Sequence, residues 1–261
     1  MNYKIFYRLT LIALLFVLLC CDLPTQPGPQ PKDITETSLE PGLNIFGVIR
    51  LEEQKQESFV YIEKALPTDE YYQSLDDTIK NANVEIWQEN DTSRYFFKIN
   101  PAQNNARYTN QSFIPVAEKT YHVSASANTE QGLLSASGST VVPPVPDLAR
   151  DSTTITDNYL KVNSTNSQTI NRWDLIVYYE DQMIAQQVFY DQINFPVTFN
   201  LEQIPVRPTK LEIIAHDENL ATYLQASNAL FPQTYREDIS TVDEGYGCFG
   251  AISVKNISLG E

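Results

Sequence analysis

The glycines near the end of the chain have the spacing most closely tied to a known chemistry. Gly245, Gly247 and Gly250 match the pattern G-x-G-x-x-G. In a dinucleotide site this pattern follows a strand and begins a helix, so that a pyrophosphate lies at the helix N-terminus. Here Asp243 and Glu244 precede the glycines and would repel phosphate, and the residues that follow have the composition of a strand. We therefore expect a glycine-permitted turn into a last strand, and no cofactor.

The other reactive side chains form no recognisable catalytic or metal-binding pattern. His122 and His216 are the only histidines, and neither has a Cys or a second His at ligand spacing. The acids at 69–70 and 76–77 lack the D-x-D-x-D-G pattern of a calcium loop, which favours a solvated loop. Cys248 has no identifiable base partner, and no G-x-S-x-G segment is present. We predict no catalytic residue and no metal site, although a pair of acids for glycoside hydrolysis would be identified only by its geometry.

Clusters of aromatic residues say more about possible ligand binding than the histidines, acids and cysteine do. Rings are adjacent at Tyr71-Tyr72, Tyr95-Phe96-Phe97 and Tyr178-Tyr179. Neighbouring side chains on a strand face opposite sides, so some of these rings point away from a core. An exposed ring can stack on a sugar or fill a partner's pocket, but rings also pack between domains or cover the rim of a sandwich. Both interpretations stay open, and no individual ligand-binding residue is predicted.

Residues 1–20 have the pattern of an export signal. Lys4 and Arg8 precede an apolar run at 9–19, which is shorter than the roughly 20 residues of a membrane-spanning helix. Leu18-Leu19-Cys20-Cys21 then resembles the lipobox of bacterial lipoproteins, with Cys21 as the acylated residue and the membrane anchor. Acylation of Cys20 would place the bulky Leu19 before the modified residue, and the remaining alternative is an ordinary cleaved signal with two incidental cysteines.

Charge and cysteine content restrict the partners and the means of stabilisation. The 261 residues carry 18 Lys and Arg against 33 Asp and Glu, a formal charge of −15. Such a surface would repel a polyanion, which argues against nucleic-acid binding. If the signal is removed and Cys21 is acylated, Cys248 is the only remaining thiol. An exported domain of this kind has no disulfide framework and is stabilised by its core.

The elements that must position these residues are short strands. Residues 21–42 are Pro-rich and predict a tether, and residues 143–146 (Pro-Pro-Val-Pro) interrupt the chain again. We predict an N-terminal antiparallel β-sandwich-like (Ig-like) domain at 43–142 and a C-terminal β-rich domain at 147–261, with one short helix near 217–230 capped by Asp217. The expected strands are 43–50, 58–63, 83–88, 94–100, 120–127, 135–142, 173–180, 184–190, 195–201, 210–215 and 248–257.

Four segments resemble the domain-of-unknown-function 4249 family of bacterial outer-membrane lipoproteins. Leu43–Gly47 is similar to its opening strand, Lys80–Ile86 to an Ala-x-Val segment, Val141–Pro143 to the end of its first domain, and Asp243–Ala251 to a closing Gly-x-Gly-x-Phe-Gly-Ala motif. Glu244 departs from that motif, which has another Gly there. The resemblance implies two β-rich domains, no established activity, and association with TonB-dependent outer-membrane transporters.

Three functional hypotheses follow from these features. The first is a lipid-anchored cell-envelope protein without enzymatic activity, an accessory or docking component of an outer-membrane (TonB-dependent) uptake assembly. The second is a surface module that binds a glycan or peptide through exposed aromatic rings. The third is an envelope hydrolase, since fold class does not determine function.

Overall fold

The computed structural model describes residues 40–52, 57–65, 78–99, 107–148, 153–156, 158–163, 171–190, 193, 195–202, 204, 206–227 and 240–259, all within one compact unit, Leu39–Glu261. This part of the chain is mainly β, with a large sheet and one short helix. No helix in it is long and apolar enough to cross a membrane. The expectation of a β-rich protein with a single short helix is therefore confirmed for the described residues.

The strands expected from the sequence are present, with ends that differ by a few residues. Before the Pro-rich segment at 143–146 the strands are β1 (Leu43–Glu52), β2 (Phe59–Lys64), β3 (Asn83–Gln88), β4 (Tyr95–Ile99), β5 (Tyr108–Thr109), β6 (Thr120–Thr129) and β7 (Gly132–Val141). After it come β8 (Thr153–Ile155), β9 (Tyr159–Val162), β10 (Arg172–Tyr179), β11 (Gln182–Tyr190), β12 (Val197–Asn200), β13 (Lys210–His216), α3 (Glu218–Ser227), β14 (Val242–Asp243) and β15 (Tyr246–Ser258). The sequence did not predict β5, β8, β9 and β14, because two to four residues are too few to show an alternating pattern.

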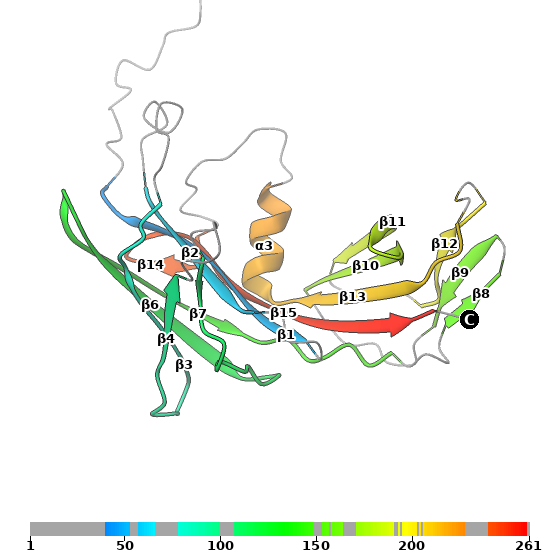
Figure 1. Cartoon of the computed structure of the whole chain (residues 1–261), viewed down its shortest axis with the longest axis horizontal. Helices are drawn as coiled ribbons and strands as arrows, with labels where there is room; N and C mark the ends of the chain where they lie inside the picture. The colour runs from blue at the N-terminus through cyan, green and yellow to red at the C-terminus, as the bar shows by residue number, and fades with distance from the viewer. Residues whose placement is uncertain are drawn as a thin grey trace, which may run out of the picture. The chain divides into compact units, whose positions relative to one another are not determined.

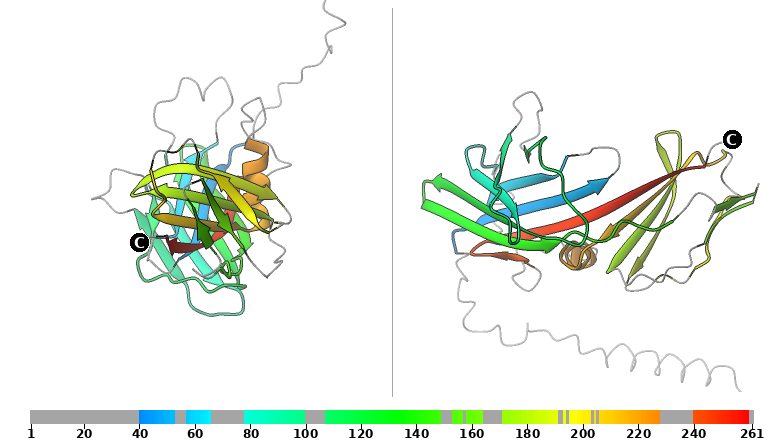
Figure 2. Two further views of the ribbon diagram at one scale, coloured as in Figure 1. Left: turned by 90° about the vertical axis from the view of Figure 1, so that its right-hand side faces the viewer. Right: turned by 90° about the horizontal axis from the view of Figure 1, so that it is seen from below.

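One strand connects the two halves of the chain. The order in the larger sheet is β11-β10-β13-β15-β1-β2-β5-β4-β3-β6-β7-β14, and β12-β9-β8 form a second, three-stranded sheet. The long strand β15 lies between β1 and β13 (Figure 1), and Figure 2 shows it beside β1 from other sides. Strands from both sides of the Pro-rich segment therefore belong to a single sheet, an arrangement that the sequence did not predict.

The pairing of β1 with β15 corrects one expectation. The two strands run parallel, with Asn44 paired with Tyr246 and Glu52 with Val254, whereas we expected antiparallel pairing throughout. All the other strand pairs of the described residues are antiparallel. Parallel strands need a long connection between them, and β1 and β15 have almost the whole chain as theirs.

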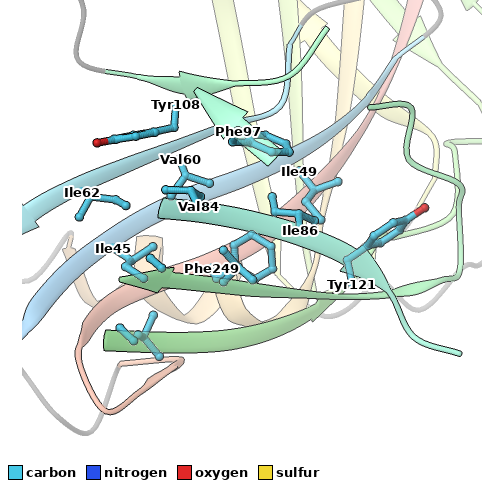
Figure 3. Close-up of a cluster of buried hydrophobic side chains, with 14 of the residues drawn as sticks. Ile45, Ile49, Val60, Ile62, Val84, Ile86, Phe97, Tyr108, Tyr121 and Phe249 are labelled. Carbon is cyan, nitrogen blue, oxygen red and sulfur yellow. The ribbon is translucent and has the colours of Figure 1, made fainter. Parts of the chain in front are cut away.

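Two apolar cores lie on these sheets. The first collects residues of β1 to β7 and also takes Phe249 and Ala251 from β15 (Figure 3). The second lies between the larger sheet, represented by Trp173, Leu175 and Leu211, and the three-stranded sheet of β8, β9 and β12. Because β15 contributes to both cores, the burial of its apolar side chains stabilises both halves of the molecule.

Helix α3 forms a third, smaller contact on the larger sheet. Leu220, Tyr223 and Leu224 of the helix pack against Val48 of β1 and Ile252 of β15, together with their apolar neighbours. The helical spacing of these three side chains creates one apolar stripe, as the sequence indicated. The helix begins after Asp217 as predicted and is described to Ser227. This contact places the first turn of α3 beside the end of β13.

Candidate functional site

Polar side chains gather on one face of strands β10, β13, β15 and β1. Arg172 pairs with His216, which pairs with Ile252, which in turn pairs with Arg50. Directly paired residues project to the same face of a sheet, and so do residues two apart along one strand. The face also carries Ile252 and Val254, against which α3 packs. We call the polar members of this set the ionic face; they are Arg50, Glu52, Arg172, Asp174, Tyr178, Lys210, Glu212, His216 and Asn256.

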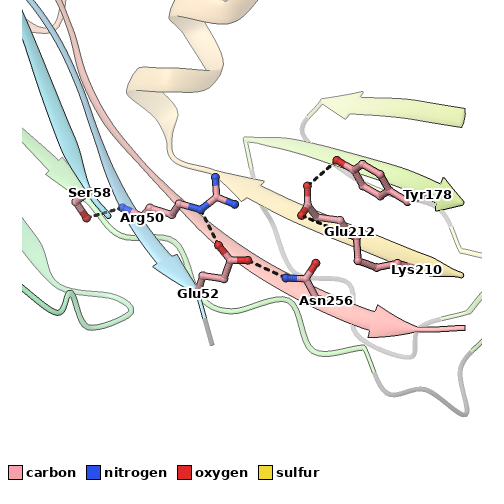
Figure 4. Close-up of polar contacts among 7 residues, drawn as sticks. All are labelled: Arg50, Glu52, Ser58, Tyr178, Lys210, Glu212 and Asn256. Atoms are coloured by element: carbon pink, nitrogen blue, oxygen red, sulfur yellow. Dashed lines mark hydrogen bonds and ion pairs between the residues drawn. The ribbon is translucent and has the colours of Figure 1, made fainter. Parts of the chain in front are cut away.

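One part of the ionic face is a set of polar contacts between β1 and β15 (Figure 4). Arg50 Nε lies 2.7 Å from Glu52 Oε2, and Asn256 Nδ2 donates to Glu52 Oε1 at 2.8 Å. The side chain of Glu52 is only 3% exposed, so these two partners replace its water. A buried carboxylate without partners would be costly, and here strands β1 and β15 are tied together by satisfying it.

A second group of contacts joins β10 to β13. The hydroxyl of Tyr178 donates to Glu212 Oε1 at 3.2 Å, and Lys210 Nζ lies 3.8 Å from Glu212 Oε2. The ammonium group of Lys210 also lies 4.1 Å from the centre of the Tyr178 ring. Burial raises the pKa of Tyr178, and the neighbouring Glu212 carboxylate raises it further. Tyr178 therefore serves here as a neutral hydrogen-bond donor.

A deeply buried ion pair joins Arg172 and Asp174. Arg172 Nε and Nη2 donate to the two carboxylate oxygens at 2.8 and 3.0 Å, and both side chains are 9% exposed. The hydrogen bond to Asp174 raises the pKa of Arg172. Burial alone would raise the pKa of Asp174, but its interactions with His216 and Arg172 outweigh burial and lower it. Both groups are therefore held in their charged forms.

His216 lies against this pair but is not fully satisfied by it. Its Nε2 is 3.5 Å from Asp174 Oδ2, within range of an ion pair but without a hydrogen bond. Its Nδ1 has no hydrogen-bond partner among the described residues, and the residue is 6% exposed. An unsatisfied buried polar group of this kind typically costs about 1–3 kcal/mol.

In the next residue, Asp217, both carboxyl oxygens accept hydrogen bonds. Its Oδ1 accepts from the backbone N–H groups of Leu220 and Ala251, each at 3.0 Å, and Thr140 donates to Oδ2 at 2.5 Å. The carboxylate thus caps α3 and ties it to β15 and β7. Burial raises the pKa of Asp217, against the effect of the N–H and O–H donors that surround it.

A cavity of about 380 Å³ opens at the junction of β13 and α3. Its lining includes His216 and Glu218, with Glu118 and Pro143 from the segments next to β6 and β7. We call it the junction cavity. None of its lining residues is a Lys or an Arg. Its volume is in the range of sites for small ligands.

The glycine pattern at 245–250 has a structural role. Gly247 lies in β15 with φ of 104°, and a Cβ there would be 2.1 Å from the carbonyl oxygen of Ile45. At Gly250 a Cβ would be 2.7 Å from Leu220 Cβ and 2.9 Å from Asp217 Oδ1. The spacing therefore allows β15 to approach β1 on one side and α3 to approach β15 on the other. The pattern leads into a strand, as predicted.

Cys248 is buried between β15 and α3 in the smaller apolar contact. Burial raises its pKa to about 12, with the Asp217 carboxylate adding to the shift and Thr241 opposing it. Only the thiolate is a good nucleophile or metal ligand, and Cys248 is a neutral thiol at physiological pH. It behaves as a small apolar side chain.

His122 and the aromatic residues singled out in the sequence do not gather at one site. His122 stacks on Trp87, with ring centres 5.4 Å apart, and the guanidinium of Arg94 lies 3.7 Å from the centre of the Trp87 ring. Among the residues that the structure describes, no group of three or more His, Cys, Asp or Glu is placed to hold a metal ion. On β4, Phe96 is 62% exposed and Phe97 is 2% exposed, which confirms that adjacent rings face opposite sides.

Several predicted features lie outside the described residues. They are the signal at 1–20, the acylation site Cys21 with most of the tether at 21–42, the acids at 69–70 and 76–77, and Tyr71-Tyr72. The comparisons add nothing for these segments, since no family model matches the chain and no curated protein matches it. The resemblance to the domain-of-unknown-function 4249 family therefore stays a prediction.

Proposed function

We propose that the chain is a lipid-anchored cell-envelope protein without enzymatic activity that docks onto partner proteins, as an accessory component of a TonB-dependent outer-membrane uptake assembly. The sequence of residues 1–21 supports export and acylation at Cys21. Several acyl chains would hold the chain on a membrane despite its charge of −15, because each buried CH₂ contributes about 0.8 kcal/mol.

The observation that carries the docking role is the edge strand β11. It ends the larger sheet, and its nine residues, QMIAQQVFY, contain no charged residue, Gly or Pro. Met183 is 58% exposed and Val188 is 38% exposed. Natural proteins usually protect such an edge with charges, Pro or a bulge, because its unpaired backbone groups can bind another strand. β11 has one such irregularity at Ile184, and its register with β10 is regular from Ala185 to Tyr190. An uncharged edge of this length suits the addition of an extended segment from a partner protein.

The proposal includes the finer fold expectation of two Ig-like β-sandwich-like domains. The two separate apolar cores support it, since the first is built mainly from strands β1 to β7 and the second from strands that follow the Pro-rich segment. Phe249 of β15 also packs in the first core, so the two halves share this strand. We therefore treat the two halves as one rigid docking body on a tether.

Acylation is tested by comparing the two neighbouring cysteines. Mass spectrometry of the full chain purified from membranes should find the lipid on Cys21 as the new N-terminus. The variant Cys21→Ala should lose the lipid and leave the membrane fraction, whereas the matched variant Cys20→Ala should keep both. An unmodified, freely soluble chain from the parent sequence would contradict the anchor.

Docking is tested through the edge strand. Gentle crosslinking of native membranes should recover the chain with a TonB-dependent transporter, identified by mass spectrometry. Met183→Lys places a charge on the edge and should reduce the recovered complex about ten-fold or more, while Leu133→Lys, at a residue 70% exposed in β7, should not. Equal recovery of the complex with both variants would show that β11 is not the docking edge.

Glycan or peptide binding through aromatic rings is the second candidate, and Phe96 is the observation that favours it. Trp87 is less suited to stacking on a sugar, because Arg94 and His122 already contact its ring. A ligand array probed with the full chain and with Phe96→Ala separates the candidates. Saturable binding that disappears with Phe96→Ala would support this second function, and no binding to any member of the array would count against it.

A further inference from the structure

We propose that β11 binds an extended segment of a partner protein as an added strand, and that this segment alternates apolar with polar side chains and has a basic residue at one end. The inference rests on the docking role of β11 and deepens it, because it assigns the chemistry of the segment. It is argued from the direction of the free backbone groups of β11, from the side chains on its two faces, and from the charges in the turn that precedes it.

The free backbone groups of β11 follow from the pairing of the strands beside it. Asp217, directly after β13, donates its backbone N–H to the carbonyl of Ala251 on β15 at 3.0 Å. Successive residues bond to opposite sides of a strand, so the odd-numbered residues of β13 bond to β15 and the even-numbered ones to β10. The same alternation across β10 leaves its odd-numbered residues to bond to odd-numbered residues of β11. Gln186, Val188 and Tyr190 therefore direct their N–H and C=O groups away from β10.

These outward groups lie at an open edge. β11 is the end strand of the larger sheet, and no other strand of the described residues pairs with this side of it. Its register with β10 is regular from Ala185 to Tyr190, and Gln186 and Val188 are exposed. Donors and acceptors on alternate residues of a regular stretch match the hydrogen bonds of an added strand.

The two faces of β11 favour different side chains in the added strand. Ala185 and Phe189 pack against the second apolar core but are only partly buried. On the same face Gln187 Nε2 donates to the backbone carbonyl of Thr198 on β12 at 3.0 Å, so the edge of the smaller sheet lies close to β11. Apolar side chains of an added strand would extend the core along these two edges. On the opposite face Val188 is exposed, and the alternate side chains of the added strand would remain in water.

Charge complementarity favours a basic residue at one end of the segment. The turn between β10 and β11 consists of Glu180 and Asp181, which are both exposed, whereas β11 has no charged residue. The whole chain has a formal charge of −15. A Lys or Arg at the end of the added strand beside this turn is attracted to the two carboxylates, and an acidic residue there is repelled.

Synthetic peptides test the pairing on the full chain in detergent, without the native partner. The probe is a capped, fluorescently labelled octapeptide, Lys-Val-Thr-Val-Thr-Val-Thr-Lys, and its binding is measured by fluorescence anisotropy. N-methylation of its valines or of its threonines removes the backbone donors on one side of the strand or on the other. One set should weaken binding about ten-fold or more and the other less than about three-fold, because only one set faces β11. Sensitivity at the threonines assigns an antiparallel strand, and sensitivity at the valines a parallel one.

Changes in sequence test the chemistry of the segment. The same peptide with Glu at both ends should bind about three-fold more weakly or worse. The order Lys-Val-Val-Val-Thr-Thr-Thr-Lys, which has the same composition without the alternation, should also bind more weakly. In the chain, Glu180→Gln/Asp181→Gln should weaken binding of the first peptide about two- to five-fold. Glu130→Gln, at an exposed carboxylate in the turn between β6 and β7, is the control and should leave the affinity unchanged.

Proline variants test the direction of the backbone groups of β11. Val188→Pro removes an outward N–H and no hydrogen bond to β10, and Pro is tolerated in this position of an edge strand, so the chain should fold and bind the peptide about ten-fold more weakly or worse. Val188→Thr keeps the N–H and should bind like the parent chain. Gln187→Pro removes an N–H that bonds to β10 and should lower the midpoint of thermal unfolding more than Val188→Pro does.

The added strand and the proposed uptake assembly can fail separately. Peptide binding with the expected dependences, but without a transporter recovered by crosslinking, would support the added strand and refute the transporter as its source. A transporter recovered equally with Val188→Pro and Val188→Thr would keep the assembly and overturn the added strand. No saturable peptide binding, equal effects of the two methylated sets, or equal binding of the Lys and Glu peptides would also overturn the proposal.

Discussion

The two faces of strands β10 and β13 are both buried, but they are built from opposite kinds of side chain. Trp173, Leu175 and Val177 point to the second apolar core. Their neighbours Arg172 and Asp174 point to the ionic face and are buried almost as deeply. The same strands therefore allow a direct comparison of apolar burial with ionic burial at matched depth.

The comparison shows that apolar and ionic side chains buried on the same strands contribute differently to stability. Apolar burial contributes roughly 25 cal/mol per Å² and stabilises the fold directly. A buried ion pair gains little net stability, because removing both charges from water costs about as much as their attraction returns. We infer that the apolar face holds the sheets together and that the ion pairs of the ionic face contribute little net stability.

The largest effect is expected from breaking the buried pair. Asp174→Ala leaves the guanidinium of Arg172 buried without its counter-charge and should reduce the free energy of unfolding by about 3–5 kcal/mol. Urea denaturation measures it. Asp181→Ala, at an exposed carboxyl in the turn after β10, is the control and should change stability by less than about 0.5 kcal/mol. Similar values for the two variants would mean that the pair is solvated in solution.

A comparable loss is expected on the apolar face. Leu175 is 0% exposed, so Leu175→Ala should reduce the free energy of unfolding by about 2–5 kcal/mol, through lost burial and the cavity left behind. The conservative change Ile213→Val on the paired strand should reduce it by only about 0.5–1.5 kcal/mol. The same denaturation assay checks both, and a loss below about 1 kcal/mol for Leu175→Ala would contradict a packed core at this position.

A smaller effect is expected in the pH dependence of stability, which should differ in sign between the buried residues Asp174 and Asp217. The folded-state pKa of Asp174 lies below 3.8, so its contribution is present above that value and is lost as the pH falls through the folded pKa. The folded-state pKa of Asp217 lies above 3.8, so its contribution is complete below that value and is lost as the pH rises through the folded pKa. Unfolding should be measured from about pH 2.5 to pH 7.

Asparagine variants test this difference, because the loss in free energy of unfolding that they cause should change with pH in opposite directions. The destabilisation caused by Asp174→Asn should grow as the pH rises, and that caused by Asp217→Asn should shrink. The parent chain at each pH is the reference. Parallel slopes would show that the two carboxyls share one environment, which would refute the distinction between the ion pair and the helix cap.

The smallest effect concerns Cys248, which should not react in the native state. With its pKa raised to about 12, the thiol should resist a maleimide at pH 7.5 in the folded chain and react in urea. Cys248→Ser should abolish the urea-dependent labelling and so assign it. Rapid labelling of the native chain at this residue would show that the contact between α3 and β15 opens readily.

Much of the fold was accessible from local sequence patterns. The ranges 83–88 and 210–215, with their β-branched and aromatic residues, became β3 and most of β13, and Asp217 marked the start of α3. The parallel pairing of β1 with β15 was not accessible, because it joins segments from opposite ends of the chain and no local pattern records a partner.

The candidate site was mostly hidden for the same reason. His216 was considered alone, since Arg172 and Asp174 approach it only through the register of β10 with β13. One signal was present, because Arg172 and Asp174 are two apart in a run that is otherwise apolar, which places both charges on one face of a strand. The junction cavity combines segments far apart in sequence and required the tertiary structure.

The most direct test of the central claim is the double variant Arg172→Met/Asp174→Leu, with its free energy of unfolding measured by urea denaturation. Replacing the whole pair by apolar side chains leaves no unpaired charge, so the free energy of unfolding should stay within about 1 kcal/mol of the parent chain or increase. A loss of several kcal/mol would show that the ionic face serves stability and would contradict the account.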